Sequence, residues 1–186
     1  MATQVTKRLF TVHEYQRMAE TGILSDRDRV ELIHGEILAM SPIGPRHGAA
    51  VDRATRAMVN VTGDLAIVRV QGSVGLDEYN QPQPDIVLLR PKADYYASSN
   101  PTPADILLIV EVADTSLEYD RGPKEQLYAE ARVPEYWVAD VQNDCLFACS
   151  EPHDRSYRQV RQFHRGDLIA PLLLPQCRLL VDVLLP

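Results

Sequence analysis

Two apolar segments of strand length each carry a single acid, and this pairing limits the possible folds more than any other feature of the chain. Asp85 directly precedes the run Ile86–Leu89, and Glu111 lies near the end of the run Ile106–Val112. A carboxylate in a strand is costly to remove from water unless a proton, a partner charge or a metal ion compensates it. Two such strands in one sheet could bring both acids to a metal ion. Alternatively, Asp85 caps a turn and Glu111 forms a buried ion pair.

The length and composition predict a single domain over residues 1–186. With 186 residues, 45% of them hydrophobic and 24% charged, the chain can bury a full core. Its apolar stretches are far shorter than the roughly 20 residues of a membrane helix. Lys7 and Arg8 are not followed by the apolar segment of a signal peptide. We therefore expect a cytoplasmic protein with no membrane partner.

The three cysteines predict neither a disulfide framework nor a zinc site. Cys145, Cys149 and Cys177 form no CxxC pair, and an odd count without a signal peptide argues against a set of disulfides. Cys145 and Cys149 have the same parity in a predicted strand, so we interpret them as small core residues.

The formal net charge of −7 argues against a simple nucleic-acid binder, because such proteins usually have a basic surface. It does not exclude a nuclease, in which acidic residues gather at the metal. Arg46, Arg53 and Arg56 lie in one short stretch. They could form a local phosphate-binding patch or a solvated helix face.

Capping and turn signals predict alternating helices and hairpins. Thr11 and Glu14 have the spacing of a capping box and begin a helix to about Ala19. Gly35, at the second position of a tight turn, predicts a hairpin. Two more helices are expected over residues 47–61 and 123–132, the latter after the irregular connection 113–119. The predicted strand segments are 30–33, 36–40, 67–70, 74–76, 86–89, 106–112, 136–139, 145–148, 157–163 and two in 168–185. This order indicates an α/β or α+β sheet protein.

Asp85 and Glu111 suit a magnesium-dependent hydrolase. Phosphodiester hydrolysis needs a divalent cation to neutralise developing charge and to make hydroxide near neutral pH. Magnesium prefers oxygen ligands, commonly one or two carboxylates with water and phosphate. Two carboxylates about 4 Å apart repel by about 4 kcal/mol at an effective dielectric constant of 20, and a divalent cation between them turns this cost into attraction.

Lys124 is the candidate cation beside the two acids. The chain has 19 lysine and arginine residues, and only Lys7, Lys92 and Lys124 are lysines. A lysine at a candidate site can orient a water or stabilise the transition-state phosphate. Tyr128, four residues later, lies on the same helix face and could donate a hydrogen bond to phosphate or simply pack.

These residues resemble the PD-(D/E)XK nuclease superfamily and, within it, the restriction-endonuclease-like Uma2 family. The resemblance is strongest over residues 10–140, and it rests on the order and spacing of several motifs, each of them weak alone. The matching stretches are Val30–Ile37, Met40–Pro42 with His47, Gln83–Ile86, Val110–Val112, Asp120 with Lys124 and Tyr128, and Val133–Val138.

The resemblance implies a central mixed β-sheet flanked by helices, with the acids on two neighbouring strands. It maps the first acid of the motif to Asp85 and the second to Glu111, with Mg²⁺ or Mn²⁺ held by both and by the backbone of Val112. One position departs from the motif. Ala113 stands where the lysine of the motif would be, and Lys124 on the next helix resembles the displaced lysine that this family uses instead.

Three further residues have open interpretations. Glu31 is a further metal-site acid by resemblance, or a surface hairpin residue. His47, at a predicted helix start, could contact a metal-bound water or a substrate phosphate, or be structural. Asp120 could hold Lys124 by an ion pair or cap its helix. The aromatic residues of the Glu135-Tyr136-Trp137 stretch are expected in the core.

The leading hypothesis is a magnesium-dependent DNA endonuclease, or a nuclease whose nucleic-acid substrate is unassigned. Family resemblance makes a homodimer reasonable. A second reading is a catalytically degenerate nucleic-acid-binding or regulatory protein on a nuclease fold, which the net charge and Ala113 favour. A third is a metal-dependent hydrolase of a small phosphorylated substrate.

Overall fold

The computed structural model describes residues 6–25 and 27–186, which form two compact units. The smaller unit combines residues 1–42 with 75–82, and the larger unit combines residues 43–74 with 83–186. The chain therefore passes between the two units more than once. The expectation of a single domain stays a prediction.

The smaller unit contains a helix and a hairpin, both predicted from the sequence. Helix α1 (Val12–Glu20) begins with the expected capping box: the Glu14 N–H donates to Thr11 Oγ1 (3.2 Å), and the Thr11 N–H donates to Glu14 Oε2 (3.0 Å). Strands β1 (Val30–Ile33) and β2 (Glu36–Ala39) pair antiparallel. The capping signal therefore located the start of α1 correctly.

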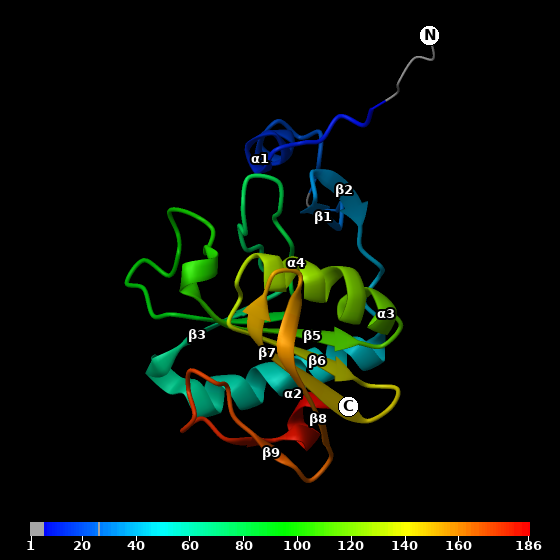
Figure 1. The fold of residues 1–186 in the computed structure, drawn as a ribbon. Helices are drawn as coiled ribbons and strands as arrows, with labels where there is room; N and C mark the ends of the chain where they lie inside the picture. Colours follow the sequence, from blue (N-terminus) through cyan, green and yellow to red (C-terminus); the bar gives the residue numbers. More distant parts are fainter. Residues whose placement is uncertain (1–5, 26) are drawn as a thin grey trace. The chain divides into compact units, whose positions relative to one another are not determined.

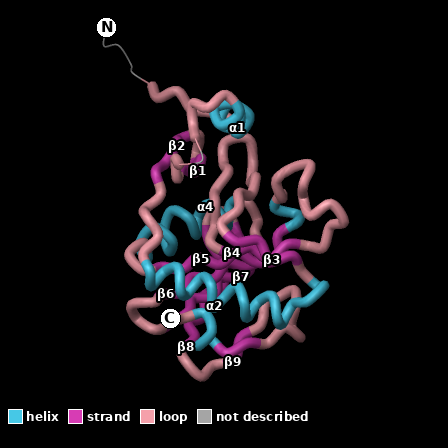
Figure 2. Tube along the Cα trace, turned by 180° about the vertical axis from the view of Figure 1, so that it is seen from behind, coloured by secondary structure: helices cyan, strands magenta, loops and turns pink. Residues whose placement is uncertain are grey.

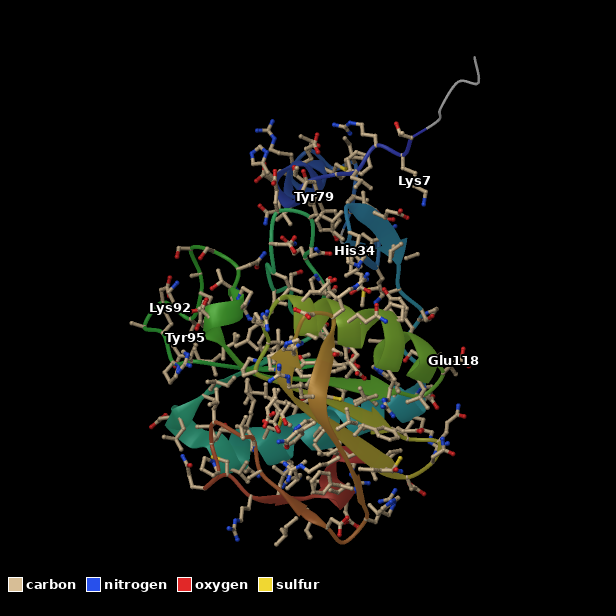
Figure 3. The ribbon with its side chains drawn as sticks, in the orientation of Figure 1. Lys7, His34, Tyr79, Lys92, Tyr95 and Glu118 are labelled. Atoms are coloured by element: carbon tan, nitrogen blue, oxygen red, sulfur yellow. The ribbon has the colours of Figure 1, made fainter. Side chains whose placement is uncertain are left out.

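The turn between β1 and β2 needs glycine at its second position. His34 and Gly35 have φ of 51° and 72°, the left-handed values of a tight hairpin turn. A Cβ atom on Gly35 would lie 2.7 Å from Leu9 Cβ. The Gly35 N–H donates to the Tyr79 carbonyl (2.9 Å), and Figure 3 labels His34 and Tyr79 on the two segments.

The larger unit is built on a six-stranded mixed sheet with the order β3-β4-β5-β6-β7-β8 (Figure 1). Strands β5 and β6 are parallel, and the other neighbours are antiparallel. The fold is thus α+β with a central mixed sheet flanked by helices, as expected. The strands are β3 (Ile67–Val70), β4 (Ile86–Leu89), β5 (Ile106–Ala113), β6 (Glu135–Asp140), β7 (Cys145–His153) and β8 (Ser156–His164).

Helices cover both faces of this sheet. Helix α2 (Pro45–Thr62) packs its buried Ala50, Ala54 and Met58 in one apolar cluster with sheet residues such as Val110 and Trp137. The opposite face carries α4 (Glu125–Glu130), and Figures 1 and 2 show α2 and α4 on the two sides. Because side chains alternate along a strand, Glu111 lies on the α4 face while its neighbours Val110 and Val112 join the α2 cluster.

Short elements complete the larger unit. Strands β9 (Leu168–Ile169) and β10 (Leu179–Leu180) form a separate two-stranded sheet, which confirms the two short strands expected in the C-terminal segment. The three cysteines are free and buried, and for Cys145 and Cys149 this burial was expected. The 3-10 turns are η1 (Gly63–Leu65), η2 (Pro103–Asp105) and η4 (Val181–Leu184).

Two expectations about elements are wrong. Residues 74–76 do not form a strand, because the Leu76 N–H closes a turn on the Asn80 carbonyl (2.9 Å). The irregular connection ends earlier than expected, since α3 (Leu117–Tyr119) and the π-helical turn η3 (Asp120–Lys124) precede α4. Pro123 has no N–H to donate, and the helix accommodates it within this π turn instead of beginning there.

None of the helices in residues 6–25 and 27–186 combines the length and the apolar character that a membrane crossing requires.

Candidate functional site

Asp85 and Glu111 meet within the larger unit's sheet, where strand β4 begins beside the C-terminal half of β5. Antiparallel pairing of β4 and β5 places Ile86 opposite Val110, so the residues just beyond this pair are neighbours. The Asp85 N–H donates to Glu111 Oε2 (3.1 Å), and the Val112 N–H donates to Asp85 Oδ2 (2.9 Å). Each acid therefore accepts a backbone hydrogen bond from the strand of the other, which fixes both carboxylates.

Lys124 and Tyr128 converge on a single oxygen of Glu111. The Lys124 ammonium and the Tyr128 hydroxyl both donate to Glu111 Oε1, each over 2.9 Å. The side chains of Lys124 and Glu111 are only 8% and 4% exposed, so their ion pair is buried. The structure thus brings the displaced lysine to the second acid, across the sheet face that α4 covers.

The local helix geometry explains this convergence. Lys124 ends the π turn and Tyr128 lies one α-helical turn later, so both side chains share the face toward β5. Tyr128 is fully buried, and its ring lies 4.9 Å from that of Tyr136. This packing leaves the Tyr128 hydroxyl little freedom to leave Glu111.

His47 reaches Asp85 from the first turn of α2. Its Nε2 lies 3.0 Å from Asp85 Oδ2, and the two side chains are 18% and 14% exposed. His47 Nδ1 is buried and has no hydrogen-bond partner within the described part of the chain. The structure therefore joins four segments, those carrying His47, Asp85, Glu111 and Lys124 with Tyr128.

Burial and charge shift the pKa values of these groups in different directions. Burial raises the pKa of Glu111 to about 8, against the opposing charge of Lys124. Burial also raises the pKa of Asp85, but the hydrogen bond and charge of His47 outweigh it and the net shift is downward. The hydrogen bond with Asp85 raises the pKa of His47, as do the charges of Asp114 and Asp120.

The remaining acceptor capacity of the two carboxylates fits a divalent cation. A carboxylate has about four lone-pair sites. Glu111 accepts two hydrogen bonds on Oε1 and one on Oε2, and Asp85 accepts two on Oδ2. Counting the described residues alone, Asp85 Oδ1 and one lone-pair site of Glu111 Oε2 therefore remain for a cation. The described residues contain no cluster of three or more His, Cys, Asp or Glu side chains arranged for a metal ion. Magnesium needs only one or two carboxylates and completes its shell with water, so this oxygen set is sufficient.

Three other positions singled out in the sequence are Ala113, Asp120 and Glu31. Ala113 ends β5 and is buried, so strand β5 itself carries no lysine after Glu111, and the neighbouring ammonium is that of Lys124. Asp120 does not cap the helix, because α3 precedes it without a break; its carboxylate accepts a hydrogen bond from Ser116 Oγ (2.5 Å). Glu31 lies in the smaller unit and is buried, contrary to the surface reading, and its role in catalysis stays a prediction.

The arginines of α2 are exposed, and two of the three also bind backbone carbonyls. Arg46 donates to the Val141 carbonyl (2.5 Å) and Arg53 to that of Asp182 (3.1 Å). Their role in binding phosphate stays a prediction.

Sequence reasoning missed Asp114, whose charge contributes to the raised pKa of His47. Its position directly after the acid-bearing strand β5 was the available signal.

Comparisons with known proteins agree with this architecture. The crystal structure of "a putative nuclease belonging to DUF820 from Anabaena variabilis ATCC 29413" superposes with a TM-score of 0.73, covering 94% of this chain and 97% of that one. The two sequences are 15% identical, so this likeness shows the fold alone. A comparison with curated proteins gives no match. The family model Uma2, described as "Putative restriction endonuclease", matches residues 12–182. Because this match covers most of both units, the chain belongs to the Uma2 family.

Proposed function

We propose that this protein is a metal-dependent endonuclease that hydrolyses phosphodiester bonds of DNA. The observation that carries the proposal is the joining of Asp85 and Glu111, with Lys124 supplying the ammonium that is missing at Ala113. A lysine on a neighbouring helix can place its charge where the motif lysine would act. The Uma2 family and the nuclease-like fold support the same conclusion.

Asp85 and Glu111, with the backbone carbonyl of Val112, would hold Mg²⁺ or Mn²⁺. When bound, such a cation neutralises phosphate charge and lowers the pKa of water toward neutrality. The reciprocal backbone hydrogen bonds hold the two carboxylates in place before the cation arrives. This preorganisation limits the rearrangement that binding requires.

Lys124 and Tyr128 would position the second acid and stabilise charge. Both donate to Glu111 Oε1, so neither helix donor occupies Oε2, which would bind the cation. The Lys124 ammonium also supplies a positive charge near the reacting phosphate and can orient an attacking water.

His47 would orient Asp85 and contact the substrate. Its Nε2 is paired with Asp85 Oδ2. Its Nδ1 is buried and has no partner within the described residues, so a phosphate oxygen or a water would reach it only after the imidazole turns. The first turn of α2 contains no acidic residue, and a helix start favours anions.

The proposal also includes four further properties: DNA as the substrate, a homodimeric state, a cytoplasmic location and Glu31 as a further acid of the metal site. The buried position of Glu31 supports a role beyond surface solvation, because a buried carboxylate needs compensation.

A cleavage assay tests the proposal. Supercoiled and linear duplex DNA, single-stranded DNA and RNA are incubated with the protein and Mg²⁺ or Mn²⁺. We expect cleavage that EDTA abolishes and that Asp85→Asn and Glu111→Gln each reduce by about 100-fold or more. The matched control is Asp52→Asn on the exposed face of α2, which should retain full activity. Absence of cleavage by the metal-loaded wild type, or cleavage by either site variant at the wild-type rate, contradicts the proposal.

Ala113 and the net charge of −7 favour a second candidate, a catalytically inactive DNA-binding protein on the same fold. It predicts binding with a steep salt dependence, no turnover, and no effect of Lys124→Ala on affinity.

A further inference from the structure

Strand β8 (Ser156–His164) is a long and exposed edge of the larger unit's sheet. Within the described residues it pairs with β7 on one side and with no strand on the other. Seven of its nine residues are exposed, including Val160 at 44%. A free edge presents unpaired N–H and C=O groups that can accept another strand. The other edge, β3, has four residues, three of them half-buried, so it offers much less backbone.

We propose that β8 is the surface on which a second copy of this chain docks, antiparallel and across a two-fold axis at Val160. The two sheets would then form one continuous sheet through the dimer. This inference specifies the surface of the proposed homodimer and does not depend on nuclease chemistry.

The symmetry of the strand fixes the register. A two-fold axis perpendicular to the sheet keeps each side chain on its own face, so only residues of equal parity oppose each other. The nine residues of β8 overlap completely only when Val160 opposes its own copy. In that register Arg158 faces Gln162 of the second copy, and Gln159 faces Arg161 of the second copy.

These cross-strand pairs are complementary. A guanidinium has only donors, and the glutamine side-chain oxygen can accept from it. The Val160 pair is apolar. Tyr157 and Phe163 take no part in the contact, because Tyr157 is buried against Tyr136 and donates to the Val133 carbonyl, and Phe163 packs on the apolar core. Arg158 and Arg161 have opposite parity and point to opposite faces. Arg158 lies four residues from its own copy along the strand, about 13 Å, which limits repulsion. Arg161 lies two residues from its own copy, about 7 Å, and there the exposed guanidinium groups are solvated.

Neighbouring registers are less favourable. Moving the axis one residue toward the C-terminus places Arg161 opposite its own copy, and like charges directly opposite each other destabilise a sheet. Moving it one residue toward the N-terminus shortens the overlap and places Arg161 opposite Tyr157. Length therefore disfavours both shifts, and charge disfavours the shift toward the C-terminus.

Two opposite charge changes at Gln162 test the surface and its register together. Because Gln162 is exposed and faces Arg158 of the second copy, Gln162→Glu creates two symmetric ion pairs and Gln162→Arg creates two like-charge pairs. In sedimentation equilibrium at low salt, we expect Gln162→Glu to lower the dimer dissociation constant about 3- to 10-fold and Gln162→Arg to raise it by a similar factor. The double variant Arg158→Glu with Gln162→Arg should restore a dimer at least as stable as wild type.

Asn60→Glu and Asn60→Arg provide the matched controls, because they make the same charge changes on the exposed face of α2 and should not alter dimerisation. A wild type that stays monomeric at high micromolar concentration overturns the proposal. So does a dimer that the two Gln162 variants shift in the same direction or not at all. Weaker DNA binding by Arg158→Ala in a monomeric wild type would assign β8 to nucleic acid instead. Mn²⁺ binding, measured on the same variants, reports the metal site separately.

Discussion

At the scale of single residues, Glu111 accounts for most of the electrostatics of the site. It is almost completely buried, and three donors share its two oxygens: the Lys124 ammonium, the Tyr128 hydroxyl and the Asp85 N–H. Burial raises its pKa to about 8. The negative charge of this one carboxylate can therefore be neutralised by a proton, by Lys124 or by a metal ion. A buried acid of this kind is a feature of functional sites and also of structural ion pairs.

Removing the lysine from this pair should be costly. Lys124→Met leaves Glu111 buried without its cation, and we expect a loss of about 3–5 kcal/mol in the free energy of unfolding above pH 8. Urea denaturation measures this loss of unfolding free energy. The double variant Lys124→Met with Glu111→Gln should recover part of the loss, because neither a carboxylate nor an ammonium is then buried at this position. The matched control, Lys92→Met on a more exposed lysine, should change stability by less than about 0.5 kcal/mol. A loss that small for Lys124→Met would contradict the buried pair.

The raised pKa values predict how metal-free stability depends on pH. Glu111 and His47 both have a folded pKa above the ordinary value, so each contributes stability below its unfolded pKa and loses it as pH rises through its folded pKa. For Glu111 this window runs from 4.5 to about 8. Asp85 has a lowered pKa, and its contribution is constant above its ordinary value. Thermal unfolding should therefore show lower stability at pH 9 than at pH 6. A rise across this range would contradict the shifts.

The same shift predicts proton release when metal binds. Below pH 8 the cation must displace a proton from Glu111, so Mn²⁺ affinity should rise with pH by up to tenfold per unit and level off above about pH 8. Calorimetry in two buffers of different ionisation enthalpy counts the protons released. Glu111→Gln is the control, and its residual affinity should vary less over this range.

At the scale of elements, the sequence predicted the helix start, the turn and the hairpin whose formation depends on neighbouring residues. The capping box of α1, the turn at His34-Gly35 and the hairpin of β6 and β7 each depend on neighbouring residues, and each is present. The π turn at Asp120–Lys124 was not predicted, because it depends on how the helix accommodates Pro123 while it packs on the sheet. Residues 74–76 have strand-like composition, but the chain uses their backbone in a turn instead.

Glu135 joins β6 to the C-terminal segment and provides a test at this scale. This buried carboxylate accepts hydrogen bonds from Trp137 Nε1 (2.8 Å) and from the Leu172 N–H (2.5 Å). Glu135→Ala would leave both donors unsatisfied and should lower the free energy of unfolding by about 2–4 kcal/mol. Glu135→Gln, which keeps one acceptor oxygen, should lose less. Mn²⁺ affinity should not change in either variant, and a stability of Glu135→Ala equal to wild type would contradict this role.

At the scale of the whole molecule, the site depends on contacts that no local pattern encodes. The sequence predicted the residue types and the strand positions of Asp85 and Glu111, and family resemblance pointed to Lys124. It could not predict that Lys124 and Tyr128 share one oxygen of Glu111, or that His47 contacts Asp85, because these depend on helix rotation and sheet register.

The two compact units allow a test of the single-domain prediction. The smaller unit is near the lower limit of size for independent folding, and it is built from two separate parts of the chain. We therefore expect one cooperative transition in differential scanning calorimetry, with equal calorimetric and van't Hoff enthalpies. Two resolved transitions would show that the units unfold independently.

Anomalous diffraction from a crystal soaked in manganese tests the central claim most directly. We expect a manganese peak bound by Asp85 Oδ1 and Glu111 Oε2, at about 2.2 Å from each oxygen, with the Lys124 ammonium still hydrogen-bonded to Glu111 Oε1. The peak should vanish in Asp85→Asn crystals of the same form. Saturating manganese with no density between the two carboxylates, or with ordered density only elsewhere, would contradict the assignment of this site.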